Sequence, residues 1–401
     1  MNRRQKSVIA ALLYMRRMKR RRKHRYWVHP VRLGREQHGE YHRLVLELRL
    51  DSDLFQQYFR LSRELFDELL ARVGPSISKL DTRFRRAIGP AQRLAICLRY
   101  LATGDSFRTI AFSYRVGHCT VCRVVKEVAD AIWQVLVAEF MPAPSREDWL
   151  SVAEGFRERW NFPNCVGSID GKHVIIQAPD NSGSLYYNYK GTHSIVLLAV
   201  VDSNYLFRVV DVGGYGRASD GGTLYNSAFG EGLRDGTLDL PEDATIRGAE
   251  QRGRMPFVFV GDEAFPLRRN LMRPFPGPHV HGEKRVFNYR LSRARLVVEC
   301  AFGILSSQWR MYRRVIGASP ATAEVCVRAT CVLHNYLRVM TLRRKETSAG
   351  YRQPGEGGAD DCLQGVSRMA ANNATREALR VRAQFASYFN QEGAVPWQVQ
   401  P

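Results

Sequence analysis

The sequence predicts an α/β protein in which helices flank a mixed sheet, with an all-helical region before it. Short and almost continuous apolar runs between residues 165 and 260 are typical of buried strands. Outside that stretch, apolar residues recur at three- and four-residue spacing, which is typical of helices that bury one face. A chain of 401 residues is long enough to enclose one large core or two ordinary ones.

Residues 1–45 are interpreted as a basic arm. Residues 1–25 contain eleven Lys and Arg and no acidic residue, and the whole chain carries a net charge of +21. Because Lys and Arg release condensed counterions when they contact phosphates, a nucleic acid is the expected partner. The densest part, 16–23, is typical of a nuclear-import or DNA-contacting tail, with a solvated run of charge as the alternative. We therefore expect the protein in the nucleus, with the cytoplasm as a second compartment.

Two further features bear on the compartment. The apolar run at 8–15 is too short to span a bilayer, and arginines follow it where a signal peptide would have a cleavage site. The eight cysteines show none of the spacings of a small disulfide-bonded domain, which favours a reducing compartment. No membrane is therefore expected among the partners.

Residues 46–145 are predicted to be helical. Apolar residues at helical spacing predict one helix at 59–70, where Ser62 is a candidate cap. A second helix is predicted at 90–101, and it ends before a glycine.

The end of this region is predicted to be similar to a helix-turn-helix. A short helix at 106–112, a turn at 116–117 and a longer helix at 120–136 give the expected pattern. Arg123 and Lys126 would face outward on the longer helix, where they are candidate DNA contacts. The alternative is an ordinary helical hairpin that packs on the catalytic domain.

Residues 150–340 are predicted to form the domain that holds the sheet. Three apolar runs separated by turns predict an antiparallel meander, and a fourth run predicts a further buried strand. The four runs are 165–169, 194–201, 206–212 and 257–260. Helices are predicted after the fourth strand, at 292–306 and 322–337.

The rest of the chain is predicted to be a linker followed by one helix. Residues 341–373 are mostly Gly-rich and polar, which predicts a flexible linker. Residues 374–401 are predicted to form a C-terminal helix and a tail.

Two acidic residues follow apolar strands, and a third lies in a basic helix. Asp170 follows the first strand, and Asp262 follows the fourth. Glu299 is the only acid among residues 284–314, which contain eight Lys and Arg. Phosphoryl transfer with two divalent ions needs converging carboxylates, and Mg²⁺ and Mn²⁺ favour oxygen ligands. The three carboxylates therefore predict a site for such ions. For Glu299 alone, an ion pair with Arg295 one turn earlier is the alternative.

Asp220 is a fourth candidate, just beyond the third strand. It either supports the metal ligands from behind or caps a helix that begins near Thr223. The capping and orienting role is the favoured interpretation, and Arg295 is a second candidate for a supporting role.

Four segments in this order resemble the PIF/Harbinger-type DDE transposases and the nucleases derived from them. They cover about residues 55–340 and are specific as an ordered set. The segments are Gly167-Ser168-Ile169-Asp170-Gly171-Lys172-His173, Lys190-Gly191-Thr192-His193-Ser194, Gly261-Asp262-Glu263-Ala264-Phe265, and Asn288-Tyr289-Arg290-Leu291-Ser292 continuing through Arg295 and Glu299 to Phe302-Gly303.

The resemblance implies an RNase H-like catalytic core with a triad of Asp170, Asp262 and Glu299. It also implies divalent metal ions as cofactors, action on DNA in the nucleus, and a separate Myb-like protein that assists DNA binding. A homodimer is a further expected state. No Myb-type repeat is evident in this chain, which agrees with such a division of labour.

The function expected from these features is metal-dependent cleavage or strand transfer at DNA phosphodiester bonds. Four residues near the first motif are candidates to hold the strand through its phosphates. They are Lys172, His173, Lys190 and His193. The alternative function is that of a domesticated DNA-binding or regulatory protein that keeps the fold without catalysis.

Overall fold

The computed structural model describes residues 3–19, 26, 28–83, 86–277, 280–347, 363–365 and 374–399. The α-helices are α1 (Arg3–Lys19), α2 (Pro30–Leu33), α3 (Arg35–His38), α4 (Leu44–Leu48), α5 (Ser52–Phe59), α6 (Arg63–Ile77), α7 (Pro90–Thr103), α8 (Phe107–Ser113), α9 (His118–Phe140), α10 (Arg146–Trp160), α11 (Asp220–Asn226), α12 (Ala228–Asp235), α13 (Glu283–Gln308), α14 (Pro320–Thr347) and α15 (Arg376–Asn390). The strands are β1 (Cys165–Ile175), β2 (Ser194–Val201), β3 (Phe207–Tyr215), β4 (Ala244–Thr245), β5 (Arg254–Met255), β6 (Val258–Val260), β7 (Leu271–Met272) and β8 (Leu363–Gly365). Single 3₁₀ turns are η1 (Glu250–Arg252), η2 (Arg310–Arg313) and η3 (Pro396–Val399).

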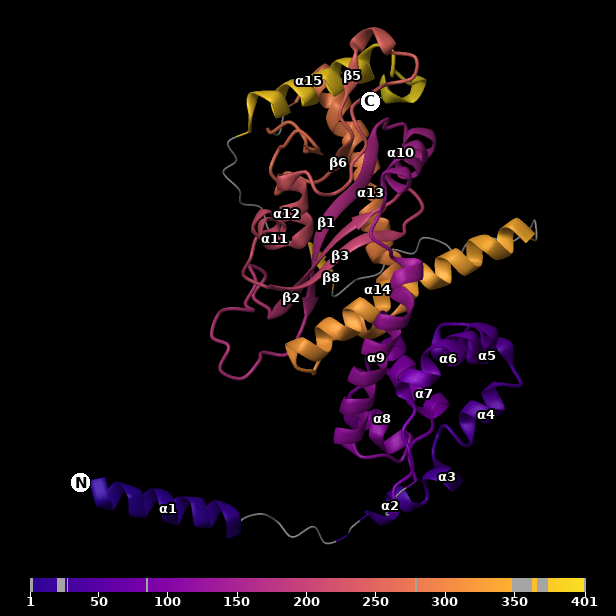
Figure 1. Ribbon diagram of the computed structural model, residues 1–401, viewed down its shortest axis with the longest axis vertical. Helices are drawn as coiled ribbons and strands as arrows, with labels where there is room; N and C mark the ends of the chain where they lie inside the picture. Colours follow the sequence, from indigo (N-terminus) through magenta and orange to yellow (C-terminus); the bar gives the residue numbers. More distant parts are fainter. Residues whose placement is uncertain are drawn as a thin grey trace.

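The main sheet is mixed and has the strand order β3-β2-β1-β6-β7 (Figure 1). Strands β1, β2 and β3 form the antiparallel meander that the apolar runs predict. Strands β6 and β7 run parallel to β1. This is the RNase H-like arrangement, so the predicted fold class is confirmed.

Helices cover both faces of the sheet, as the alternation of β2 side chains shows. Every residue of β2 is buried, which explains its continuous apolar run. Leu197, Ala199 and Val201 pack into a core with residues of α13 and α14. Leu198 and Val200 point to the opposite face, where they pack with Leu224 of α11 and Phe229 of α12.

Strand β1 is longer than the sequence predicts. The expected strand ended at Ile169, but β1 continues to Ile175 and pairs with β2 along Ser168 to Ile175. Asp170 therefore lies inside the central strand and not at its end. The Asp170-Gly171-Lys172 segment does not form a loop, because hydrogen bonds to β2 extend past it.

The N-terminal region is helical, as predicted. Ser62 caps α6 through a hydrogen bond from the amide of Leu65, as expected. Helix α7 begins at Pro90 and ends at Thr103, and the left-handed conformation of the following Gly104 is typical of a helix end.

Helices α8 and α9 meet in the order expected for a helix-turn-helix. The long helix α9 also packs along α14 of the sheet domain, which is the contact expected of the alternative, a helical hairpin packed on that domain. Arg123 and Lys126 are exposed on α9, as predicted.

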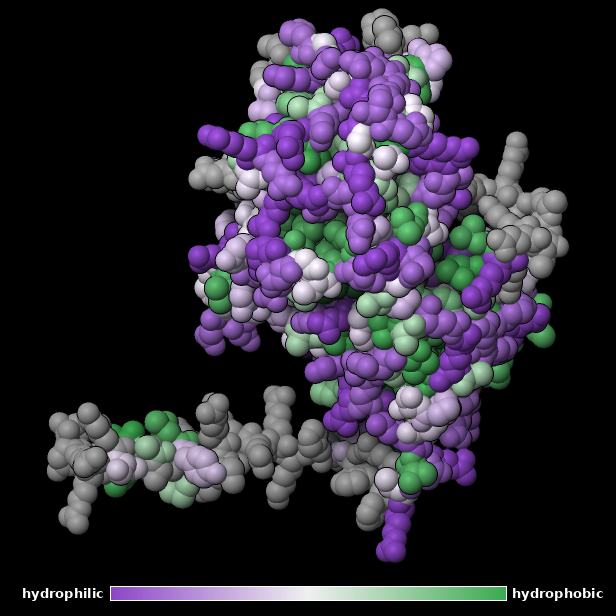
Figure 2. All heavy atoms as spheres, turned by 45° about the horizontal axis from the view of Figure 1, so that its top comes forward, coloured by the Kyte–Doolittle hydropathy of each residue, from purple (hydrophilic) through white to green (hydrophobic). Residues whose placement is uncertain are grey.

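Part of the basic arm lies outside the described residues. Residues 16–19 belong to α1, but residues 20–25 and 27 are not described. Helix α1 extends away from the body of the molecule, and Figure 2 shows hydrophobic side chains on its surface. They include Val8, Leu12 and Leu13, which are all more than half exposed. None of the described helices is both long and apolar enough to cross a lipid bilayer.

The expected linker at 341–373 is described only in part. Helix α14 continues to Thr347, and the three residues of β8 pair with Lys172, His173 and Val174 of β1. Residues 348–362 and 366–373 lie outside the described residues. Helix α15 follows and packs on α13, which places the C-terminal segment against the sheet domain (Figure 1).

Candidate metal centre

Parallel pairing of β1 and β6 places Asp170 beside Asp262. Ser168 of β1 is the register partner of Val260 of β6, and each aspartate follows two residues later. Neighbouring strands lie about 4.8 Å apart, so the two side chains are brought to the same level of the sheet. Gly261 is required here, because a Cβ at this position would lie 2.9 Å from the Phe265 ring and 3.1 Å from Ile169.

Asp220 is the third carboxylate of the centre. Carboxylate oxygens of Asp170, Asp220 and Asp262 all lie within 4.8 Å of one another, and these residues are called the aspartate cluster below. The favoured capping role of Asp220 is wrong. Helix α11 is capped by Ser219, which accepts a hydrogen bond from the amide of Gly222, and Asp220 is the first helical residue.

Asp220 has the least favourable environment for a charged carboxylate in the aspartate cluster. It is fully buried, and neither of its carboxylate oxygens accepts a hydrogen bond from the residues that the structure describes. Burial, followed by the charges of Asp170 and Asp262, raises the pKa of Asp220 to about 9. Burial and the charge of Asp170 also raise the pKa of Asp262. Such a site favours either a bound proton or a bound cation.

The other two aspartates are held in place by backbone amides. Asp170 accepts a hydrogen bond of 2.8 Å from the amide of Gly171. Asp262 accepts one of 2.9 Å from the amide of Ala264. Each carboxylate therefore has a fixed orientation and still offers oxygen lone pairs to a ligand.

Two cationic side chains lie at the edge of the aspartate cluster. The Lys172 ammonium is 3.3 Å from the Asp170 carboxylate, so the two side chains form an ion pair. The charges of Lys172 and Arg295 both lower the pKa of Asp220, against the larger effect of burial. These two cations reduce the repulsion among the three carboxylates but do not bond to Asp220.

Glu299 lies outside the aspartate cluster. Its carboxylate is 3.0 Å from the Arg295 guanidinium, and 43% of its side chain is exposed. The ion pair with Arg295, which the sequence left as the alternative for this residue, is therefore what the structure shows. The metal-ligand role of Glu299 stays a prediction that rests on the family resemblance.

The donor set of the aspartate cluster fits a hard divalent cation. All of the ligand atoms are carboxylate oxygens, which Mg²⁺ and Mn²⁺ prefer to nitrogen or sulfur ligands. Both carboxylate oxygens of Asp220 are buried without a partner among the residues that the structure covers, and a cation would satisfy them. The residues present therefore fit the cofactor that the sequence predicts.

One candidate DNA contact is wrong, and others stay open. His173 is fully buried in β1, where its Nδ1 is 2.8 Å from the Ser194 hydroxyl, so it cannot contact a DNA backbone. Burial and the charge of Lys190 lower the pKa of His173 to about 4. Lys190 is exposed and His193 is half-buried, and both lie on the loop between β1 and β2.

Comparison with known proteins finds a family model that matches the sheet domain. The fold is RNase H-like, and the aspartate cluster lies at its sheet. Residues 169–335 match the model of the DDE superfamily endonuclease family. No solved structure matches the chain significantly.

Several known proteins are similar over most of this chain. "Protein ALP1-like" of Arabidopsis thaliana is 26% identical over 304 residues, which are 72% of this chain and 71% of that protein. "Putative nuclease HARBI1" of Mus musculus and of Homo sapiens are each 26% identical over 306 residues, or 74% of this chain and 82% of those proteins. These relatives confirm the resemblance to Harbinger-type DDE proteins.

Proposed function

We propose that this protein cleaves or transfers strands at DNA phosphodiester bonds, with divalent metal ions held by the aspartate cluster. The observation that carries the proposal is the convergence of three carboxylates on one small volume. One of them is buried with no hydrogen-bond partner in the described part of the chain. A stable fold rarely keeps such an arrangement unless a ligand uses it. The endonuclease family of residues 169–335 supports the same reaction class.

The residues of the centre have distinct roles in this proposal. Asp170, Asp220 and Asp262 hold Mg²⁺ or Mn²⁺, which supply Lewis-acid activation of the phosphate and of the attacking oxygen. Lys172 orients Asp170 through its ion pair and is close enough to meet a phosphate oxygen. The rigid strands β1 and β6 fix the spacing of Asp170 and Asp262 before any ligand arrives.

Glu299 is proposed as a further ligand on the strength of the family resemblance. Its carboxylate is now held by Arg295, which lies one helical turn away on α13. Its use in the centre requires that this exposed ion pair breaks, and such pairs contribute only about 0.3–0.5 kcal/mol. The cost of moving Glu299 is therefore small.

DNA is the proposed substrate because the chain is strongly basic. The net charge of +21 and the exposed Arg123, Lys126 and Lys190 support contacts to a phosphate backbone. We also propose action in the nucleus, a separate Myb-like partner and a homodimer, which rest on the sequence and the family resemblance alone.

A second function is favoured by the position of Glu299. If the Arg295–Glu299 ion pair never opens, the protein is a DNA-binding protein that keeps the fold without cleavage. Metal binding separates the two functions, because a cation that binds only the folded state raises the melting temperature.

The decisive experiment is a DNA-cleavage assay with Mg²⁺ or Mn²⁺ on the Asp262→Asn variant. We expect cleavage to fall by more than about 100-fold, because the loss of a metal ligand removes several kcal/mol of transition-state stabilisation. Asp211→Asn is the matched control, since Asp211 is another partly buried aspartate of the sheet whose pKa burial raises. Equal cleavage by wild type and Asp262→Asn would exclude the proposed centre.

A further inference from the structure

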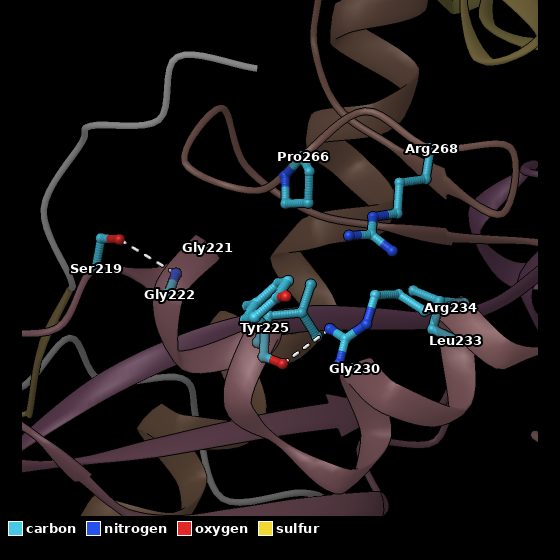
Figure 3. A pocket seen from close by; sticks show the side chains of 10 residues that line it. Ser219, Gly221, Gly222, Tyr225, Gly230, Leu233, Arg234, Pro266 and Arg268 are labelled. Carbon is cyan, nitrogen blue, oxygen red and sulfur yellow. Dashed lines mark hydrogen bonds between the residues drawn. The ribbon is translucent and has the colours of Figure 1, made fainter. Parts of the chain in front are cut away.

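A cavity of about 140 Å³ lies next to the aspartate cluster, between α11, α12 and the loop after β6 (Figure 3). Several residues that line the cavity are close in sequence to two of the three aspartates. Ser219 and Gly221 are the chain neighbours of Asp220, and Pro266 and Arg268 follow Asp262 on the same loop. The cavity is therefore built from the same two segments that carry Asp220 and Asp262.

Two arginines from different segments line the cavity. Figure 3 shows that the side chains of Arg234 and Arg268 enter the space between the loop and the two helices. Arg234 donates a hydrogen bond of 2.8 Å to the carbonyl of Tyr225, and its guanidinium lies 4.3 Å from the centre of the Tyr225 ring. In the part of the chain that the structure describes, neither arginine has a carboxylate within ion-pair distance.

Arg268 differs in its partners from the next residue along the chain. Many described arginines pair with a carboxylate, and Arg269, directly beside Arg268 in the chain, pairs with both Asp243 and Glu377. Arg268 instead is half-buried, and burial followed by the charge of Arg234 lowers its pKa. Two like charges that share a partly desolvated cavity repel each other, and an anion between them removes that cost.

We propose that the cavity binds one backbone phosphate of a DNA strand whose neighbouring phosphodiester lies at the aspartate cluster. Arg234 and Arg268 hold the phosphate oxygens with planar guanidinium groups, which suit phosphate better than a single ammonium. A water molecule needs about 10–15 Å³ of such space, so the cavity has room for a phosphate group in place of several waters. Tyr225 is 60% exposed, so solvent reaches the cavity beside its ring.

This subsite deepens the proposed function and rests on it, because its position matters only if a strand lies on the aspartate cluster. The cavity sits where the strand needs a second fixed point, since one phosphate held alone leaves the strand free to rotate. Two points on successive parts of the backbone fix its direction. The cavity therefore acts as a positioning site and takes no part in the bond-breaking step.

The test measures DNA affinity without divalent metal. A labelled 20-base-pair duplex is titrated by fluorescence anisotropy against wild type and Arg234→Gln/Arg268→Gln at several salt concentrations. We expect the double variant to bind roughly tenfold more weakly at low salt, and the slope of log affinity against log salt to shrink by about 0.9 for each lost phosphate contact. Arg254→Gln is the control for Arg234→Gln and Arg268→Gln made singly, because it removes one positive charge from β5, which lies far from α11 in Figure 1.

Two further arms make the result specific. Arg268→Lys keeps the charge and loses the planar geometry, so its affinity should fall between wild type and the double variant. Melting temperatures, taken with and without inorganic phosphate at constant ionic strength, separate a DNA subsite from a site for the free anion. An unchanged salt slope in a folded double variant overturns the subsite, as does stabilisation by inorganic phosphate without an effect on DNA binding.

The failure of the subsite is distinguishable from the failure of the proposed function. The binding assay contains no divalent metal, so it gives the same result whether or not the aspartate cluster cleaves DNA. Loss of cleavage in Asp262→Asn with an unchanged salt slope in the arginine variant would support the centre alone. Unchanged cleavage in Asp262→Asn together with a smaller salt slope in the arginine variant would support the cavity as part of a DNA-binding surface. That result would exclude its role in positioning a strand for cleavage.

Discussion

The aspartate cluster and the Arg295–Glu299 pair are neighbouring regions that differ in how the charge of their carboxylates is compensated. In the aspartate cluster, the two carboxylate oxygens of Asp220 are buried without a hydrogen-bond partner among the described residues, and the pKa of Asp220 is raised to about 9. On α13, Glu299 is exposed and already holds a cation of its own chain at 3.0 Å. The contrast separates a site that needs a ligand from a pair that is satisfied without one. Predictions that compare the two regions therefore test which carboxylates hold the metal.

The largest expected difference concerns cleavage. Asp170→Asn and Asp220→Asn should each lower the rate of metal-dependent cleavage by more than about 100-fold, because each removes a ligand oxygen of the centre. Glu299→Gln should lower it by a smaller factor if the ion pair with Arg295 holds Glu299 away from the metal. A loss with Glu299→Gln as large as that with Asp170→Asn would show that Glu299 enters the centre and would break the comparison.

The next difference is in the stability of the metal-free protein. Asp220→Asn should raise the free energy of unfolding at pH 7 by on the order of 1–3 kcal/mol, because the carboxyl no longer has to stay protonated or lose its hydration. The same variant should lose the rise in melting temperature that Mg²⁺ or Mn²⁺ gives to the wild type. Chemical denaturation with and without metal measures both effects. A destabilised Asp220→Asn protein would mean that the carboxylate has a structural partner.

The dependence of stability on pH gives the third difference. The pKa of Asp220 is higher in the folded state than its ordinary value of 3.8. The folded state therefore binds the proton more tightly, and its contribution to stability is complete below pH 4 and is lost as the pH rises toward 9. The free energy of unfolding of Asp220→Asn minus that of wild type should be near zero at pH 4 and grow steadily above it. A flat difference curve in metal-free buffer would contradict the raised pKa.

This difference curve is more informative than the wild-type curve alone. Burial lowers the pKa of His173 to about 4 and that of His334 to about 3, so both are neutral when folded. Their contribution has the opposite sign, because it is present above pH 6.5 and lost as the pH falls. Both histidines are the same in the two proteins, so their effect cancels.

The smallest expected effect is that of the Arg295–Glu299 ion pair on stability. Glu299→Gln should change the free energy of unfolding by no more than about 0.5 kcal/mol, since exposed ion pairs four residues apart on a helix contribute little. Arg295→Gln should cost more in metal-free buffer, because Arg295 also lowers the pKa of Asp220 and of Asp262. Equal effects of the two variants would show that Arg295 acts on Glu299 alone.

The sequence predicts the strands of the sheet well, because each strand is marked by the composition of its own short segment. The apolar runs of β2 and β6 are buried on both faces, so their composition alone marks them as strands. The convergence of Asp170 and Asp262 is also predictable, because each follows an apolar run, although Asp170 lies within β1 and not at its end. The Arg295–Glu299 pair was foreseen as an alternative because its four-residue spacing fixes contact within one helix.

The errors arise where the fold brings distant segments together. The sequence places Asp220 beyond the third strand, but its entry into the cluster depends on how α11 packs on β2, which no local pattern encodes. A helix start with Ser219 before Asp220 offers two equally good caps, and the structure uses the serine. The prediction for His173 is wrong because β1 continues past Asp170, and the added pairing with β2 buries a residue that is expected at the surface.

The parallel pairing of β1 with β6 has a consequence for how the protein is made. Asp170, Asp220 and Asp262 come from three widely separated parts of the chain, and Asp262 is fixed only after β6 has joined β1. Non-local pairing of this kind forms late in folding. A ribosome-bound chain that has not yet released residues 258–272 therefore has no assembled centre. Assembly of the aspartate cluster, and with it any binding of a cation there, is therefore coupled to completion of the sheet.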